Sequence, residues 1–137
     1  MIIGIGHDLC DIRRIEAILK SKGQRFRARI FTNAEAKAAE ASNREASYLA
    51  LRFAAKEAVY KAFGSYNQDG LTWHDVEVVD KSEKGAPTLT LSGACLERLH
   101  EIMPQDYVPD IHLSLSDEYP YASAYVVLAA KPSHLIS

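Results

Sequence analysis

One stretch decides the fold of this 137-residue chain: Arg52-Phe53-Ala54-Ala55-Lys56-Glu57-Ala58-Val59-Tyr60-Lys61-Ala62-Phe63-Gly64. Its good helix formers predict a long helix that Ser42 or Asn43 caps at its start and that runs to Phe63. Gly64 ends this helix, because glycine readily adopts the left-handed conformation that follows a last turn. The alanines of the stretch permit neighbouring elements to pack closely against it.

The residues before the long helix predict a strand and then shorter helices. Residues 2–8 form an apolar strand that ends at Asp8. Apolar residues at helical spacing predict a helix over 11–21, with Asp11 as its cap and Gly23 as its stop. These apolar residues are Ile12, Ile15, Ile18 and Leu19.

A short turn or helix is expected over 25–31, where basic and apolar residues mix. Thr32 and Glu35 then match the pattern of a capping box, in which the two side chains satisfy backbone N–H groups at a helix start. This pattern opens an alanine-rich helix that is expected to end near Ala41.

The second half of the chain predicts strands with one helix between them. Ser92 is placed to cap that helix, Pro104 ends it, and Gly85-Ala86-Pro87 forms a turn between two of the strands. The expected strands lie at 75–81, 88–91, 111–116 and 122–130, and the helix lies at 93–102. Helices followed by strands predict a single α+β domain over residues 1–137.

The composition is that of an ordinary globular protein, with 47% apolar and 25% charged residues. No apolar run approaches the roughly 18–20 residues of a membrane span, which excludes an integral membrane protein. The apolar opening lacks the basic residues of a signal peptide. Cys10 and Cys95 lie far apart, without metal-ligand spacing. We therefore expect a cytoplasmic protein with two free thiols and no membrane partner.

The net charge of −2 conceals a gradient along the chain. Residues 1–61 hold 12 Lys or Arg against 7 Asp or Glu, whereas residues 62–137 hold 4 against 11. Over 13–29, seven basic residues face only Glu16. This pattern favours an acidic protein or a phosphate-rich ligand, or else a solvated helix face that binds nothing. Phe26 is the only aromatic residue there, which disfavours nucleic acid as the partner.

Glu57 and Lys61 are four residues apart and therefore lie on one face of the long helix. An isolated pair of this kind on an exposed helix contributes only about 0.2–0.5 kcal/mol and has no further meaning. Glu57, however, lies in a largely apolar run, where a carboxylate is expected to be buried and to need a cation.

Asp8 follows Gly4-Ile5-Gly6-His7, which lacks the third glycine of a dinucleotide-binding loop. A strand-end aspartate often caps a helix, but Asp11 can fill that role here. Asp8 together with Glu57 offers two hard oxygen ligands that leave positions for water and a substrate phosphate, as Mg²⁺ prefers. His112 adds a polar group to an apolar strand, either as a ligand contact or as a hydrogen-bonded core histidine.

Several blocks closely resemble the holo-[acyl-carrier-protein] synthase family, the small bacterial branch of the 4′-phosphopantetheinyl transferases. The blocks come in the family's order and spacing and cover essentially the whole chain. The block with Glu57 and Lys61 is the most specific. The blocks are Gly4-Ile5-Gly6-His7-Asp8 with Arg14, Thr32 with Glu35, Arg52-Phe53-Ala54-Ala55-Lys56-Glu57-Ala58 with Lys61-Ala62-Phe63-Gly64, and His112-Leu113-Ser114-Leu115-Ser116-Asp117.

The resemblance implies a fold in which an antiparallel sheet packs on the long helix, and a homotrimer with active sites between subunits. It implies transfer of 4′-phosphopantetheine from coenzyme A to a serine of acyl carrier protein, with release of adenosine 3′,5′-bisphosphate. The product would be holo carrier protein for fatty acid biosynthesis.

In the family, the matching aspartate and glutamate hold the metal, so the resemblance assigns Asp8 and Glu57 to Mg²⁺, with Mn²⁺ as the alternative ion. The ion would neutralise the coenzyme A pyrophosphate. Lys61 would stabilise the leaving phosphate, and Glu57, directly or through a metal-bound water, would take the serine proton. Asp8, Glu57 and Lys61 are thus the expected catalytic residues.

The resemblance also suggests contacts for the substrates. His112 would contact a phosphate or the ribose, Lys61 the pyrophosphate, and Arg52 and Lys56 the other phosphate of the nucleotide. Carrier proteins are acidic, and the family docks them on its first helix. The expected docking residues are Arg14, Lys22, Arg25 and Arg29.

The chain departs from the family pattern at three places. Gly64-Ser65-Tyr66 replaces Gly-Thr-Gly, and a tyrosine adopts positive φ less easily than glycine. Gly85-Ala86-Pro87 replaces Gly-Lys-Pro and loses a cation, and Asp117 stands where many members have histidine. These departures bear on substrate affinity more than on reaction type.

Two other classes of function compete with the transferase. A metal-dependent hydrolase could use the same two carboxylates, with water as the nucleophile, and would leave free phosphopantetheine. A non-catalytic module could bind an acidic partner through residues 13–29, but it would have no use for Glu57 and Lys61 in an alanine-rich helix.

Overall fold

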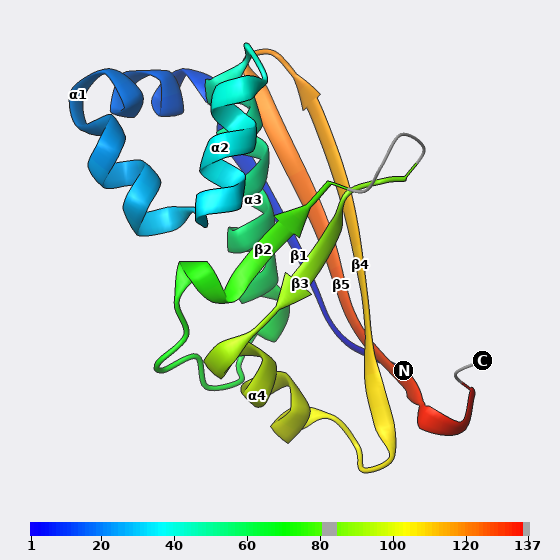
Figure 1. Ribbon diagram of the computed structural model, residues 1–137. Coiled ribbons are helices and arrows are strands. Elements are labelled where there is room, and N and C mark those ends of the chain that lie inside the picture. The colour runs from blue at the N-terminus through cyan, green and yellow to red at the C-terminus, as the bar shows by residue number, and fades with distance from the viewer. Residues whose placement is uncertain (81–84, 136–137) are drawn as a thin grey trace.

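Helix α3 (Glu45–Phe63) lies between a three-stranded sheet and the helices α1 and α2 (Figure 1). The computed structural model describes residues 1–80 and 85–135. Helix α3 contacts β1 and β5 on one side and α1, α2 and β2 on the other. Ten of its residues are buried. The helix predicted from the alanine-rich stretch is therefore the centre of the core.

The larger sheet has the order β1-β5-β4, and both of its pairings are antiparallel. Its strands are β1 (Ile2–Asp11), β4 (Tyr107–Glu118) and β5 (Tyr121–Pro132). Strands β2 (Val76–Val79) and β3 (Thr88–Leu91) form a separate antiparallel pair. The predicted α+β class and the antiparallel sheet packed on a long helix are confirmed.

The remaining helices are α1 (Ile12–Ile30), α2 (Asn33–Ala41) and α4 (Gly93–Ile102), with short 3-10 turns η1 (Trp73–Asp75) and η2 (Ser133–Leu135). Figure 1 shows α1 and α2 on the side of α3 away from the larger sheet. Within the described ranges, no helix is long and apolar enough to cross a membrane.

Most predicted helix signals are confirmed. The Asp11 side chain accepts a hydrogen bond from the Arg13 backbone N–H, and Thr32 and Glu35 form both bonds of the capping box. Gly64 follows α3 with a φ of 58°. The Gly64 prediction therefore holds for the reason given, since this backbone region favours glycine.

The predicted start of α3 is wrong. Ser42 ends α2 instead, where its hydroxyl donates to the Ala39 carbonyl oxygen, and Asn43 has a φ of 60°. Helix α3 begins only after Arg44, which makes no side-chain cap. Ser42 and Asn43 belong to the end of α2, so neither residue is available to cap α3.

Other boundaries also differ. The chain stays helical through Gly23 to Ile30, with a break at Lys22, where φ is −142°. The predicted strand over 75–81 covers only β2, and residue 81 lies outside the described residues. Strands β1, β4 and β5 are longer than predicted, and Ser92 precedes α4 without a side-chain cap bond.

The Gly4-x-Gly6 pattern serves packing between β1 and α3. A Cβ at Gly4 would overlap the Ala62 carbonyl oxygen, and one at Gly6 would overlap that of Ala58. The two backbones therefore approach as closely as glycine allows. From Gly4 to Gly6 the contact moves one turn towards the start of α3, so Asp8 continues along β1 towards the turn that holds Glu57.

We expect Gly6→Ala to lower the free energy of unfolding by about 3 kcal/mol or more, because the rigid helix backbone cannot yield to the added methyl group. Gly23→Ala is the matched control, since the Cβ there would meet only the flexible end of the Arg27 side chain. Urea unfolding of both variants checks this. Equal stability of Gly6→Ala and the unmodified protein would contradict the close approach of β1 to α3.

Candidate active site

The crossing of β1 and α3 brings together Asp8, Glu57 and Lys61. The Lys61 ammonium donates to Oδ1 of Asp8 at 2.7 Å. The Asp8 side chain is 16% exposed and that of Lys61 is 55% exposed, so the pair lies at the edge of the core and is open to a ligand. The three residues predicted to act together are therefore neighbours.

The electrostatics of the site support a cation between its carboxylates. Burial raises the pKa of Glu57 above its ordinary value, and the nearby negative charge of Asp8 raises it further. Lys61 and Arg14 act in the opposite direction. The hydrogen bond with Asp8 raises the pKa of Lys61, which keeps its ammonium charged.

The donor set fits a hard divalent ion. Asp8 and Glu57 repel each other across the site, and a divalent cation relieves that repulsion. No group of three or more His, Cys, Asp or Glu residues suited to a metal occurs in residues 1–80 and 85–135. Two carboxylates with room for water and a phosphate match the way in which proteins hold Mg²⁺.

An open groove begins at Glu57. Its other lining residues are Tyr60, Gln68, Leu71 and Trp73. The rings of Tyr60 and Trp73 meet edge to face at 5.5 Å, and the Gln68 amide donates to the Tyr60 carbonyl oxygen at 2.8 Å. Sequence reasoning missed this groove, because only Tyr60 shares the helix with Glu57.

The segment Gly64-Ser65-Tyr66, which replaces Gly-Thr-Gly in this chain, forms the loop after α3 without backbone strain at Tyr66. Among the described residues, positive φ values outside glycine occur only at Asn43 and Asp106. The Tyr66 backbone N–H donates to the Phe63 carbonyl oxygen at 3.0 Å, and its side chain is 44% exposed. The tyrosine is accommodated as an ordinary turn residue.

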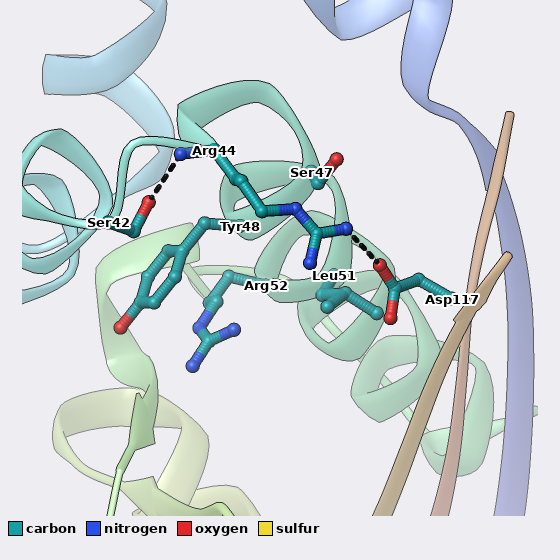
Figure 2. A pocket seen from close by; sticks show the side chains of 7 residues that line it. All are labelled: Ser42, Arg44, Ser47, Tyr48, Leu51, Arg52 and Asp117. Atoms are coloured by element: carbon teal, nitrogen blue, oxygen red, sulfur yellow. Dashed lines mark hydrogen bonds and ion pairs between the residues drawn. The ribbon is translucent and has the colours of Figure 1, made fainter. Parts of the chain in front are cut away.

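A second pocket lies near the start of α3 (Figure 2), where Arg44 and Arg52 share the lining with Asp117. The Arg52 side chain is only 6% exposed, and its guanidinium lies 3.5 Å from the centroid of the Tyr48 ring. It donates to Asp80, but its buried Nε has no hydrogen-bond partner in the described structure. The remaining lining residues are Ser42, Ser47 and Leu51.

Arg44 increases the positive charge of this pocket, and sequence reasoning missed it. Its side chain is 72% exposed and donates to Oδ2 of Asp117 at 3.2 Å. The signal that could have found it is a second arginine eight residues before Arg52, immediately ahead of α3. Two guanidinium groups line this pocket, and each already has a carboxylate partner, Asp117 for Arg44 and Asp80 for Arg52, so an entering anion meets guanidinium donors but little net positive charge.

The predicted contact between Lys56 and a phosphate of the nucleotide is wrong. The side chain is fully buried, and its ammonium lies 2.9 Å from Oε1 of Glu35. It also donates to the carbonyl oxygens of Trp73, at 3.0 Å, and of Val76. Its hydrogen bonds are made inside the protein, so Lys56 is not available to contact the nucleotide. Burial lowers its pKa despite the neighbouring carboxylate.

His112 lies apart from the other predicted site residues. It is on β4, its side chain is 63% exposed, and its Nε2 lies 3.1 Å from Oδ1 of Asp110. Its neighbours Ile111 and Leu113 pack against the core, so His112 faces outward from the sheet. It therefore lies on the face of the sheet opposite α3.

The predicted docking residues divide into two places on α1. Lys22, Arg25 and Arg29 line a shallow pocket with an apolar floor made by Ile18, Phe26 and Ile30. Arg14 lies nearer the carboxylates, since its charge lowers the pKa of Glu57. Two other arginines of the helix already have internal partners: Arg13 bonds to Asp11, and Arg27 bonds to Glu45.

Fold and site together define a class of protein. Residues 4–122 match the family model of the 4′-phosphopantetheinyl transferase superfamily. The chain belongs to this superfamily. The holo-[acyl-carrier-protein] synthase of Phenylobacterium zucineum (strain HLK1) is 48% identical over 133 residues, which cover 97% of this chain and 96% of that protein.

Solved structures agree with this assignment. Holo-[acyl-carrier-protein] synthase from Neisseria meningitidis superposes with a TM-score of 0.79 at 34% identity, covering 94% of this chain and 99% of that one. A holo-(acyl-carrier-protein) synthase from Bacillus anthracis in complex with CoA (3′,5′-ADP) gives 0.71 at 34% identity, covering 93% and 96%. The resemblance read from the sequence is confirmed.

The raised pKa of Glu57 predicts how the stability of the fold depends on pH. Because the folded protein holds the Glu57 proton more tightly than the unfolded chain does, Glu57 favours folding at low pH. This contribution is lost as the pH rises from the ordinary pKa of 4.5 through the raised value. In metal-free buffer, Glu57→Gln should therefore melt at a higher temperature than the unmodified protein at pH 7, with the difference shrinking towards pH 4.

Melting curves across this pH range check the prediction, and Mg²⁺ supplies the control. The ion should raise the melting temperature of the unmodified protein more than that of Glu57→Gln. A metal-free Glu57→Gln variant that is less stable than the unmodified protein at pH 7 would contradict the repulsion at the site.

Proposed function

We propose that this chain transfers 4′-phosphopantetheine from coenzyme A to a serine hydroxyl of acyl carrier protein and releases adenosine 3′,5′-bisphosphate. The observation that carries the proposal is the meeting of Asp8, Glu57 and Lys61 where β1 crosses α3, in a chain of this superfamily. Together these residues offer two carboxylates that could hold a cation, one of which could accept a proton, and an exposed lysine, all at one open edge of the domain.

In this mechanism Asp8 and Glu57 hold Mg²⁺, with Mn²⁺ as the alternative, and the bound ion supplies neutralisation of the pyrophosphate charge. Lys61 is exposed enough to move from Asp8 to the leaving 5′-phosphate and stabilise its growing charge. Glu57 accepts the serine proton, directly or through a water.

The reaction balances without a further reactant. The serine Oγ forms a bond to the phosphorus that carries the pantetheine, and the bond from that phosphorus to the bridging oxygen breaks. The electron pair leaves with the 5′-phosphate of adenosine 3′,5′-bisphosphate, and the serine proton goes to Glu57. Catalysis then consists of positioning and charge stabilisation.

The arginine pocket is our proposed site for the 3′-phosphate of coenzyme A. Arg52 and Arg44 supply the guanidinium groups, and the Arg44 side chain is 72% exposed. Arg44 lies 13 residues from Glu57 on or beside α3, about 20 Å along the helix axis. Because the family has its active sites between subunits, we propose that one nucleotide uses the pocket of one subunit and the carboxylates of another.

The outer face of the larger sheet supports association with further copies of the chain, and the family resemblance gives their number as a homotrimer. Ile5 is 65% exposed, Leu9 59% and Tyr125 56%, an unusual apolar surface for an isolated chain. The His7 ring stacks on Tyr125 at 4.2 Å and extends this surface. We propose that further copies of the chain cover it. His112 lies on the same face, where assembly would bring it to a nucleotide held by a neighbouring subunit.

The shallow pocket on α1 is the proposed docking site for the acidic carrier protein. Lys22, Arg25 and Arg29 would meet acidic side chains, while Phe26 offers apolar contact. Arg14 would face the carrier protein close to the reacting serine. The two free cysteines are buried, in keeping with a cytoplasmic role in fatty acid biosynthesis.

The decisive experiment is intact-mass spectrometry of apo acyl carrier protein after incubation with this protein, coenzyme A and Mg²⁺. We expect the carrier protein to gain the mass of one phosphopantetheine group, and chelator or Glu57→Ala to abolish the gain. Glu16→Ala, a carboxylate on α1 outside the site, is the matched control and should leave the gain intact. Free phosphopantetheine without a modified carrier protein would instead indicate the hydrolase.

The docking site makes a separate prediction. Reversing two charges with Arg25→Glu and Arg29→Glu should raise KM for the carrier protein about tenfold and leave KM for coenzyme A unchanged, because only the acidic protein meets this surface. Lys37→Glu together with Lys131→Glu, at exposed positions on α2 and β5, makes the same change in net charge outside the pocket. Steady-state kinetics at two salt concentrations measure both effects. An unchanged KM for the carrier protein would refute docking at this pocket.

A further inference from the structure

Asp117 is the one acidic residue in the lining of the arginine pocket. The other lining residues bring two guanidinium groups, two serine hydroxyls, Tyr48 and Leu51. Figure 2 shows the Asp117 carboxylate directed at the Arg44 guanidinium, with the pair bridging the start of α3 and the end of β4. A pocket suited to an anion thus contains an anion of its own.

The two arginines differ in how they are held. Arg52 is buried, stacks on Tyr48 and bonds to Asp80, so its position does not depend on a ligand. Arg44 precedes the first turn of α3, is 72% exposed, and has Asp117 as its charged partner at 3.2 Å. Arg44 is therefore the cation of the pocket that is free to change position, and Asp117 is its present hydrogen-bond partner.

Asp117 cannot follow Arg44 towards a ligand. Its backbone lies in β4, opposite Ala122 of β5, whereas the Arg44 side chain is long and has solvent around it. A phosphate that enters the pocket shares the Arg44 guanidinium with Asp117, and it lies close to the Asp117 carboxylate. Both effects weaken phosphate binding.

We propose that Asp117 is a specificity-determining residue that competes with the 3′-phosphate of the nucleotide for Arg44. The inference rests on the proposed function, since the ligand is the phosphomonoester of coenzyme A or of its bisphosphate product. The competition lowers affinity for both and thereby speeds release of adenosine 3′,5′-bisphosphate. A neutral residue at 117 retains the product longer.

A purely structural role for the Arg44–Asp117 pair makes a different prediction. If the pair only joined α3 to β4, removing either partner would change stability and would leave phosphate affinity unaffected or reduced in both variants. Competition for Arg44 requires opposite effects on affinity: removal of Asp117 strengthens phosphate binding, and removal of Arg44 weakens it.

The test is isothermal titration calorimetry of the full chain with adenosine 3′,5′-bisphosphate, and with adenosine 5′-monophosphate as the ligand that lacks the 3′-phosphate. Asp117→Asn should lower Kd for the bisphosphate about threefold to fivefold, the range of an exposed ion pair, and leave Kd for the monophosphate unchanged. Arg44→Gln should raise Kd for the bisphosphate, and Asp117→Asn should give no gain in that background.

Glu118→Gln is the matched control, because it removes one negative charge from the neighbouring exposed position on β4. It should leave both Kd values unchanged. Asp117→Ser replaces Asp117→Asn if the latter melts early. The inference is overturned if neither Asp117 variant binds the bisphosphate more tightly, if Glu118→Gln gives the same gain, or if the gain persists without Arg44.

The outcomes separate this inference from the proposed function. If the unmodified protein modifies carrier protein and prefers the bisphosphate while the Asp117 variants bind as it does, only the inference fails. If the unmodified protein neither transfers phosphopantetheine nor distinguishes the two nucleotides, the proposed function fails and the inference with it.

Discussion

The contact between the backbones of β1 and α3 is the constraint on which the site depends. Gly4 and Gly6 leave no side chain between the strand and the helix, so the strand lies against the carbonyl groups of Ala58 and Ala62. Asp8 is the next residue of β1 on that side. It therefore reaches the Lys61 ammonium directly, and its charge acts on Glu57. A wider spacing would separate the carboxylates and remove the proposed cation site.

The core of the site was predictable because its residues lie in two short, distinctive stretches. Glu57 and Lys61 share a helix face by spacing alone, and the glycines before Asp8 mark a close approach. The meaning of those glycines was less evident, since a Gly-x-Gly sequence also suggests a phosphate loop. The structure assigns them to packing, which the sequence could not distinguish without the alanines opposite them.

Features made by residues distant in the sequence were not predictable. Lys56 looks like a surface lysine beside Glu57, and only the fold brings it to Glu35 and to two carbonyl groups. The arginine pocket likewise needs β4 to carry Asp117 to the start of α3. The start of α3 was predicted wrongly for a local reason, because Ser42 and Asn43 could end α2 as well as begin α3.

The Glu35–Lys56 pair limits how this domain can change over time. The two charges pair with each other inside the core, and their other hydrogen bonds are to backbone groups, with both side chains at most 1% exposed. Losing one partner of such a pair costs about 3–5 kcal/mol, a large part of the 5–15 kcal/mol that keeps a domain folded. A single substitution at either position is therefore too destabilising to persist. Apolar residues could replace the pair during evolution only if both positions changed together. The capping box and the transferase helix are in this sense inherited as one unit.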